Sequence, residues 1–108
     1  MSFDIGGMMD KIRNMQTEME ETKRKLKEMK VSAESGGGMV KVSMSCDTRL
    51  KSLNIDQALL KSEDTDMLED LIVAATNKAI EEVEKTVEQE MGKLKNGMPN
   101  IPGLNLGL

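Results

Sequence analysis

The sequence contains no histidine, tryptophan or tyrosine, and only one phenylalanine and one cysteine among its 108 residues. Without histidine, a zinc site of the usual cysteine and histidine type cannot be assembled within one chain, and a single cysteine excludes an internal disulfide framework. Nucleophilic catalysis has little to be built from, because the serines lack a recognisable partner base. These absences predict a non-enzymatic protein of a reducing cytoplasm, with no metal or other cofactor.

Long apolar runs are also missing. No stretch approaches the ~20 apolar residues of a membrane-spanning helix, and no positively charged start is followed by an apolar segment. We therefore expect neither a signal peptide nor a membrane anchor. With so few bulky aromatic residues, one small domain of this length has little material for a thick monomeric core, so the chain is expected to complete its core by oligomerising.

Methionine and isoleucine recur along the first third of the chain with an average spacing of about 3.5 residues. This spacing keeps one apolar stripe on one side of a helix, and it predicts a long helix over about residues 4–30 that packs against a partner helix. The stripe comprises Ile5, Met8, Ile12, Met15, Met19, Thr22, Leu26 and Met29. The chain has eleven methionines, and core filling explains them more simply than a promiscuous binding surface does.

Alternating apolar and polar residues predict three short antiparallel strands between about residues 31 and 56. The glycine triplet 36–38 predicts a tight reversal after the first strand, because glycine adopts positive φ without steric cost. This triplet lacks the Lys-Ser/Thr that follows in a phosphate-binding loop, so we interpret it as a hairpin turn. A second turn is predicted at about 47–49. The expected apolar face comprises Val40, Val42 and Met44 in the second strand and Leu53 and Ile55 in the third.

A second long helix is predicted over about residues 65–92. Thr65 or Asp66 can cap its first turn, and Gly92 followed by the Asn-Gly pair at 96–97 is expected to end it. Its apolar stripe comprises Leu68, Ile72, Ala75, Ala79, Val83, Val87 and Met91. A three-stranded sheet with one apolar face needs a cover, and this helix can supply it.

The order helix, three strands, helix defines one α+β domain over residues 1–97, with the antiparallel sheet between two long helices. Residues 98–108 form a tail rich in proline, glycine and leucine. Its two prolines disfavour regular structure there, and the leucines could lie over an apolar groove.

The net charge of −4 conceals an uneven distribution along the chain. Residues 22–30 carry a local charge of +4, whereas residues 63–90 carry −8. The cations of the first cluster are Lys23, Arg24, Lys25, Lys27 and Lys30. Cations on an exposed helix can neutralise DNA phosphates, while the absence of Trp and Tyr argues against stacking on single-stranded bases. We assign these five residues to a candidate DNA contact; the alternative, an ordinary solvated helix face, stays open.

Three segments of the sequence resemble the YbaB/EbfC family of nucleoid-associated proteins. They are GGGMVKVSMS at 36–45, SLNIDQALL at 52–60 and DTDMLEDLIVAATNKAIEEVE at 64–84, and the tail is similar as well. The resemblance implies an α-β-β-β-α fold and a tweezer-like homodimer, in which the sheets join the subunits and the helices project. It also implies DNA binding that alters nucleoid organisation and gene expression. The family often has Asn-Gly after its second strand where this chain has Ser45-Cys46, so a turn that is wider or shifted toward Asp47 is expected here.

The leading hypothesis is a cytoplasmic, nucleoid-associated homodimer that binds double-stranded DNA with little sequence specificity and alters its conformation. Neither a membrane nor a small-molecule substrate is expected as a partner. The alternative is a protein-interaction module, such as a holdase-like clamp, because two long helices beside small hairpins also resemble prefoldin-type architecture. A methionine stripe can repack around varied partners. Suppression of aggregation by a protein that ignores DNA would favour this alternative.

Overall fold

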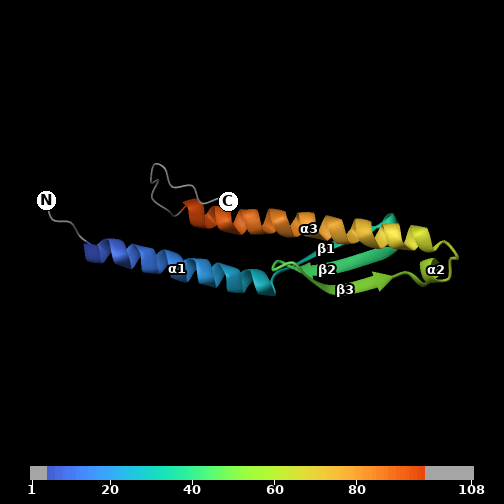
Figure 1. Cartoon of the computed structure of the whole chain (residues 1–108), viewed down its shortest axis with the longest axis horizontal. Helices are drawn as coiled ribbons and strands as arrows, with labels where there is room; N and C mark the ends of the chain where they lie inside the picture. Colours follow the sequence, from blue (N-terminus) through green and yellow to red (C-terminus); the bar gives the residue numbers. More distant parts are fainter. Residues whose placement is uncertain (1–4, 97–108) are drawn as a thin grey trace.

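A computed structural model of the chain describes residues 5–96 and, among these, the side chains of residues 5–94. The elements are α1 (Ile5–Glu28), β1 (Lys30–Ser35), the 3-10 turn η1 (Gly36–Gly38), β2 (Val40–Ser45), β3 (Arg49–Ile55), α2 (Gln57–Leu60) and α3 (Thr65–Asn96). The molecule is elongated: α1 extends from one end of the sheet, and α3 runs along both (Figure 1). The predicted α+β class and α-β-β-β-α order are confirmed. The predicted tail, 98–108, lies outside the described residues.

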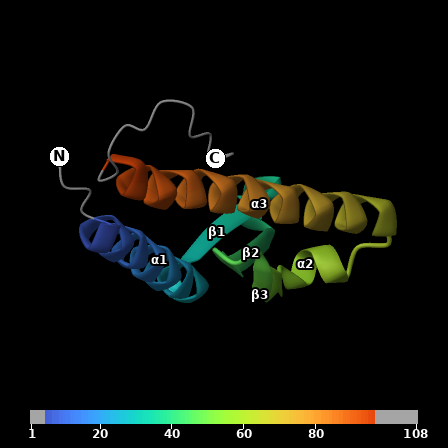
Figure 2. The ribbon, with the colours of Figure 1, turned by 60° about the vertical axis from the view of Figure 1, so that its left-hand side comes forward.

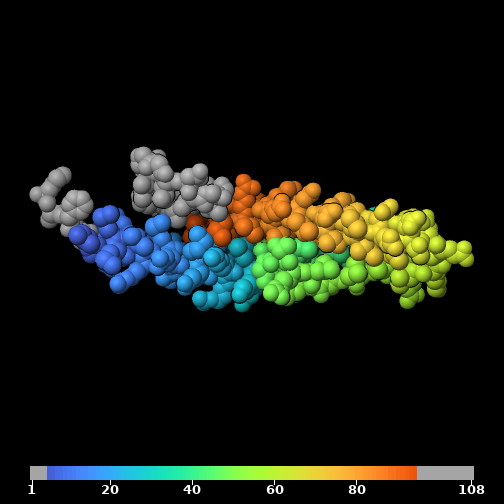
Figure 3. Space-filling model, in the orientation of Figure 1, coloured from blue at the N-terminus to red at the C-terminus, as the bar shows by residue number. Residues whose placement is uncertain are grey.

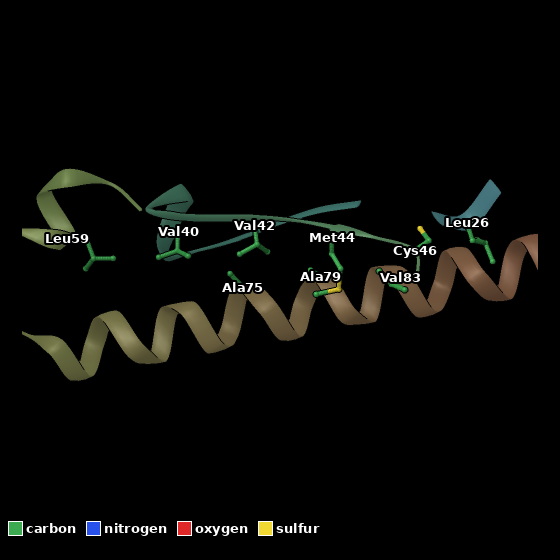
Figure 4. Close-up of a cluster of buried hydrophobic side chains, with 9 residues drawn as sticks. All are labelled: Leu26, Val40, Val42, Met44, Cys46, Leu59, Ala75, Ala79 and Val83. Carbon is green, nitrogen blue, oxygen red and sulfur yellow. The ribbon is translucent and has the colours of Figure 1, made fainter. Parts of the chain in front are cut away.

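The fold has two layers. Helix α3 forms one layer, and the sheet together with α1 forms the other, as the turned view in Figure 2 shows. The buried core between the layers contains Leu26, Val40, Val42, Met44, Cys46, Leu59, Ala75, Ala79 and Val83 (Figure 4). Both alanines are fully buried, so α3 approaches the strands closely at these positions. The apolar faces predicted for the second strand and for the second long helix therefore pack against each other.

The sheet is antiparallel with the strand order β1-β2-β3. Helix α3 lies over β1 and β2, whereas nearly all of β3 is exposed. Leu50 and Leu53 of β3 point to the same side of the sheet as their partners Met44 and Val42, but they remain 48% and 41% exposed. Within residues 5–96, the outer edge of β3 carries no further strand. One side of the sheet is therefore an open edge with uncovered apolar side chains.

The two turns differ in backbone conformation, and that of the first explains its glycines. All three glycines of η1 have positive φ, at 61°, 65° and 94°. A Cβ at Gly36 would lie 3.1 Å from the side chain of Leu71, so a larger residue there would be crowded as well as conformationally strained. The second turn spans residues 46–48 and is centred on Asp47, and Thr48 adopts a φ of 64°.

The end of α1 differs from the prediction. The helix ends at Glu28, so Lys30 begins β1 and does not belong to the basic helix. The amide of Met29 still donates to the carbonyl of Lys25 at 3.1 Å, but the carbonyl of Met29 accepts from the amide of Cys46 at 2.9 Å. This bond to a residue distant in sequence draws the chain into the sheet.

The limits of the second long helix also differ. The amide of Met67 donates to the side chain of Asp64 at 3.0 Å, so Asp64 caps α3, and the predicted caps at the next two positions lie within the helix. The helix continues through Gly92 to Asn96. A glycine inside a helix costs about 1 kcal/mol relative to alanine, which the packing of half-buried Met91 and Leu94 offsets.

Helix α2 was not predicted. Its single turn is capped by Asp56, whose side chain accepts from the amide of Ala58 at 2.8 Å. The turn inserts Leu59 into the core.

Candidate nucleic-acid interface

The charges on α1 separate onto two flanks of the helix. Successive residues of an α-helix are turned by about 100°, so neighbours in sequence diverge, while residues about 3, 4, 7 or 11 positions apart line up. One flank carries four exposed cations and Glu20; we call it the basic strip, and its cations are Arg13, Lys23, Arg24 and Lys27. The other flank is acidic and carries Asp10, Glu18, Glu21 and Glu28 beside Lys11 and Lys25. A cation-rich surface therefore runs along only one side of the arm.

The structure brings together only part of the predicted cation cluster. Lys23, Arg24 and Lys27 share the basic strip, whereas Lys25 points to the acidic flank and Lys30 lies on β1. Arg13 was not predicted, although it stands eleven residues before Arg24 and therefore on nearly the same line of the helix. The spacing of eleven residues between Arg13 and Arg24 could have identified Arg13 from the sequence.

Lys25 has a structural partner on α3. Its Nζ lies 2.9 Å from one carboxylate oxygen of Glu90, and Nζ of Lys93 lies 3.0 Å from the other. The side chain of Glu90 is only 10% exposed. These two bonds hold the pKa of the Glu90 carboxyl below its ordinary value, although burial acts in the opposite direction. Lys25 therefore fastens the arm to α3, and its charge is largely neutralised there.

We expect Glu90→Gln to lower the melting temperature by a few degrees at neutral pH, because the amide cannot neutralise Lys25 and Lys93. A carboxyl whose pKa is depressed by folding stabilises the folded state above its unfolded pKa, and this contribution is lost as the pH falls through the folded pKa. The deficit of the variant should therefore shrink below about pH 4.3, the ordinary value for glutamate. Circular dichroism melts at several pH values, with Glu88→Gln as the exposed control, would measure it. A deficit unchanged at pH 2 contradicts this role.

Two surface hollows show on which side of the molecule the basic strip lies. Across one hollow, Glu18 and Lys25 of α1 face Lys93 of α3. On the opposite flank of α3, Thr48 in the turn between β2 and β3 faces Val87 across the other hollow. Because the basic strip occupies the flank of α1 away from the first hollow, it lies on the side of this turn and of β3.

The outer surface of α3 has the opposite charge. An exposed acidic stripe runs along the helix face turned away from the sheet and comprises Asp66, Asp70, Glu81, Glu84 and Glu88. In the space-filling view, α3 occupies one long side of the molecule, and α1 with the strands occupies the other (Figure 3). An approaching phosphate backbone is repelled from the α3 side and attracted to the α1 side.

Cys46 packs as a small apolar side chain in the core. Burial raises the pKa of its thiol, and the carboxylates of Asp47 and Glu90 act in the same direction. The described residues contain no group of three or more carboxylate or cysteine side chains placed to hold a metal ion. None of the helices in residues 5–96 combines the length and the hydropathy needed to cross a membrane.

The fold and the cation strip define a class of small α+β proteins with projecting helical arms suited to nucleic acid. The model of the YbaB/EbfC DNA-binding family matches residues 1–98, so the chain belongs to this family. Among solved structures, an uncharacterized protein from Helicobacter pylori is similar, with a TM-score of 0.74 and 27% sequence identity over 86% of this chain and 98% of that chain. The family assignment made from the sequence is confirmed, and membership supports nucleoid-associated DNA binding in general.

Proposed function

We propose that the protein binds double-stranded DNA as a homodimer, with the basic strip of α1 as its main contact to the phosphates. The segregation of charge carries this proposal: the basic strip of α1 lines one side of the molecule, and the acidic stripe of α3 lines the other. From Arg13 to Lys27 the strip spans about 21 Å at ~1.5 Å per residue. That length covers about six phosphate steps of ~3.4 Å along one DNA strand.

The strip is poor in groups that read bases. Gln16 is its one side-chain amide, and the described residues contain no tryptophan, tyrosine or histidine that could stack on a base. Binding then relies on phosphate contacts, which position the protein without reading sequence. Little sequence specificity follows.

The open side of β3 supports the homodimer. Its unpaired edge, exposed Leu50 and Leu53, and exposed Val73 on the neighbouring flank of α3 form an apolar surface that a second copy can cover. Because the basic strip lies on the same side, a dimer joined there directs both strips toward the space between the arms. Two arms that hold one duplex can bend it. Because bending changes how DNA is compacted and read, we extend the proposal to the organisation of the nucleoid in the cytoplasm and to gene regulation.

The salt dependence of duplex binding tests the proposal. With about six phosphate contacts per dimer, log K should fall with a slope near −5 against log salt concentration. Fluorescence anisotropy of a labelled duplex between 50 and 200 mM salt would measure the slope. Salt-independent binding, or none at 50 mM, would overturn DNA binding through this strip.

A protein-interaction role is the second candidate, and one observation favours it. The first turns of α1 expose Ile5, Met8, Met9 and Ile12, each more than half accessible. An apolar tip of this kind suits a holdase-like clamp. Suppression of client aggregation by protein that fails to bind the duplex would select this function.

A further inference from the structure

The face of the sheet turned away from α3 is polar and uncovered within residues 5–94. Strand register places Ser32 opposite Ser43, and Ser43 opposite Ser52, so three serines form one row across the sheet. The hydroxyl oxygens of Ser43 and Ser52 lie 2.5 Å apart. In the next row, Lys41 stands between Glu34 and Asn54. These residues line a shallow hollow whose floor is made of small side chains.

The charge of this face is opposite to that of α3. Lys30 and Lys41 lie on either side of the serine row, and Glu34 is the one carboxylate of the strand residues on this face. Arg49, opposite Ser45, lies 3.5 Å from the carboxylate of Asp47 in the adjacent turn. The face therefore carries a modest positive charge.

The face is also continuous with the arm. The sheet and α1 form one layer under α3, and only Glu28 and Met29 separate Lys27 in the last turn of α1 from Lys30 at the start of β1. The side chains on this face of the strands are all polar. A protein partner needs a desolvated apolar centre for stable docking, whereas a phosphate backbone needs cations and hydrogen-bond donors. The composition of the face favours the phosphate backbone.

We propose that this open sheet face is a second contact for the DNA backbone, an inference that rests on the proposed function. Lys41 neutralises a phosphate, while the serine hydroxyls and the amide of Asn54 donate to phosphate oxygens. The side chains of the serine row are small, so the DNA backbone can approach the strands closely. The serine row crosses three strands that are ~4.8 Å apart, and it lies ~7 Å from the row that contains Lys41. The sheet thereby extends the binding surface of the arm.

Two matched pairs of variants test the sheet contact by duplex anisotropy on the full-length protein. Asn54→Asp places a carboxylate on the sheet face, and Asn77→Asp makes the same change on the exposed outer face of α3. A unit charge about 4 Å from a phosphate in water changes Kd roughly fivefold, so the first variant should bind about fivefold more weakly and the second should match the wild type. Lys41→Gln should lower the salt slope by about 0.9 for each phosphate that the lysine no longer neutralises, and Lys85→Gln should leave it unchanged.

Glu34→Gln removes the carboxylate from the sheet face and should therefore strengthen DNA binding. Misfolding would weaken binding, so it cannot produce this result. Equal affinities for the Asn54→Asp and Asn77→Asp variants, or an unchanged affinity of Glu34→Gln, would overturn the sheet contact. If these variants bind like the wild type while loss of the basic strip abolishes binding, the sheet contact fails and the proposed function stands. If the wild type does not bind duplex at 50 mM salt, both fail.

Discussion

Replacing Lys23, Arg24 and Lys27 with glutamine should weaken duplex binding at least about 100-fold at 50 mM salt and remove most of the salt dependence. Each dimer would lose six cations, and counterion release at these positions supplies nearly all of a non-specific affinity. Glutamine keeps the helix propensity and most of the side-chain volume, so the arm should stay folded. Anisotropy at 50 and 200 mM salt measures both effects, and circular dichroism verifies the helix content.

The matched control removes three positive charges elsewhere. Its substitutions are Lys11→Gln, Lys61→Gln and Lys85→Gln, at exposed positions on the acidic flank of α1, just after α2 and on α3. Charges farther from the duplex than the Debye length of ~10 Å at 0.1 M salt are largely screened, so this variant should bind within about twofold of the wild type. Equal losses in the two triple variants would mean that only net charge matters and would refute the strip as a local contact.

Leu50→Asp combined with Leu53→Asp should convert the proposed dimer to monomer. Both leucines lie on the uncovered side of β3, and burying two unpaired carboxylates there costs enough to raise the dimer dissociation constant about 100-fold or more. Because the proposed grip uses two arms, monomers also lose the bivalent gain in DNA affinity. Sedimentation velocity across a concentration series gives the assembly state, and anisotropy gives the affinity.

Leu60→Asp is the control for this surface, because Leu60 is even more exposed than Leu50 and Leu53 but lies on α2. It should leave both the assembly state and the affinity unchanged. A double aspartate variant that sediments as the wild-type dimer would show that the subunits meet elsewhere.

Local periodicity explains why the fold could be predicted. The 3.5-residue rhythm of the first helix, the alternation in the second strand and the glycine triplet each express a constraint that acts over a few residues. The end of α1 could not be predicted in this way, because it depends on the bond between Met29 and Cys46, which the folded sheet creates. Gly92 was misleading for a similar reason: packing of the neighbouring residues outweighs its weak helix propensity.

The candidate site was predicted less well than the fold. A cluster that is dense in sequence spreads around a helix, so Lys25 turned away from its neighbours and toward Glu90, a partner 65 residues away. Projection of α1 at about 100° per residue would have added Arg13 and separated Lys25. The ion pair itself depends on how α1 packs against α3, which spacing alone does not reveal.

The opposite charges of α1 and α3 give the molecule an electric dipole moment across its short dimension. In the field of a duplex, this dipole experiences a torque that turns the arm toward the DNA before contact. Random orientation limits typical protein association to about 10⁵–10⁷ M⁻¹s⁻¹, and electrostatic pre-alignment raises this toward 10⁸ M⁻¹s⁻¹ at low salt. At any given equilibrium affinity, faster association implies proportionally faster dissociation. The protein should therefore exchange among DNA segments faster than a protein of the same affinity that lacks this charge separation.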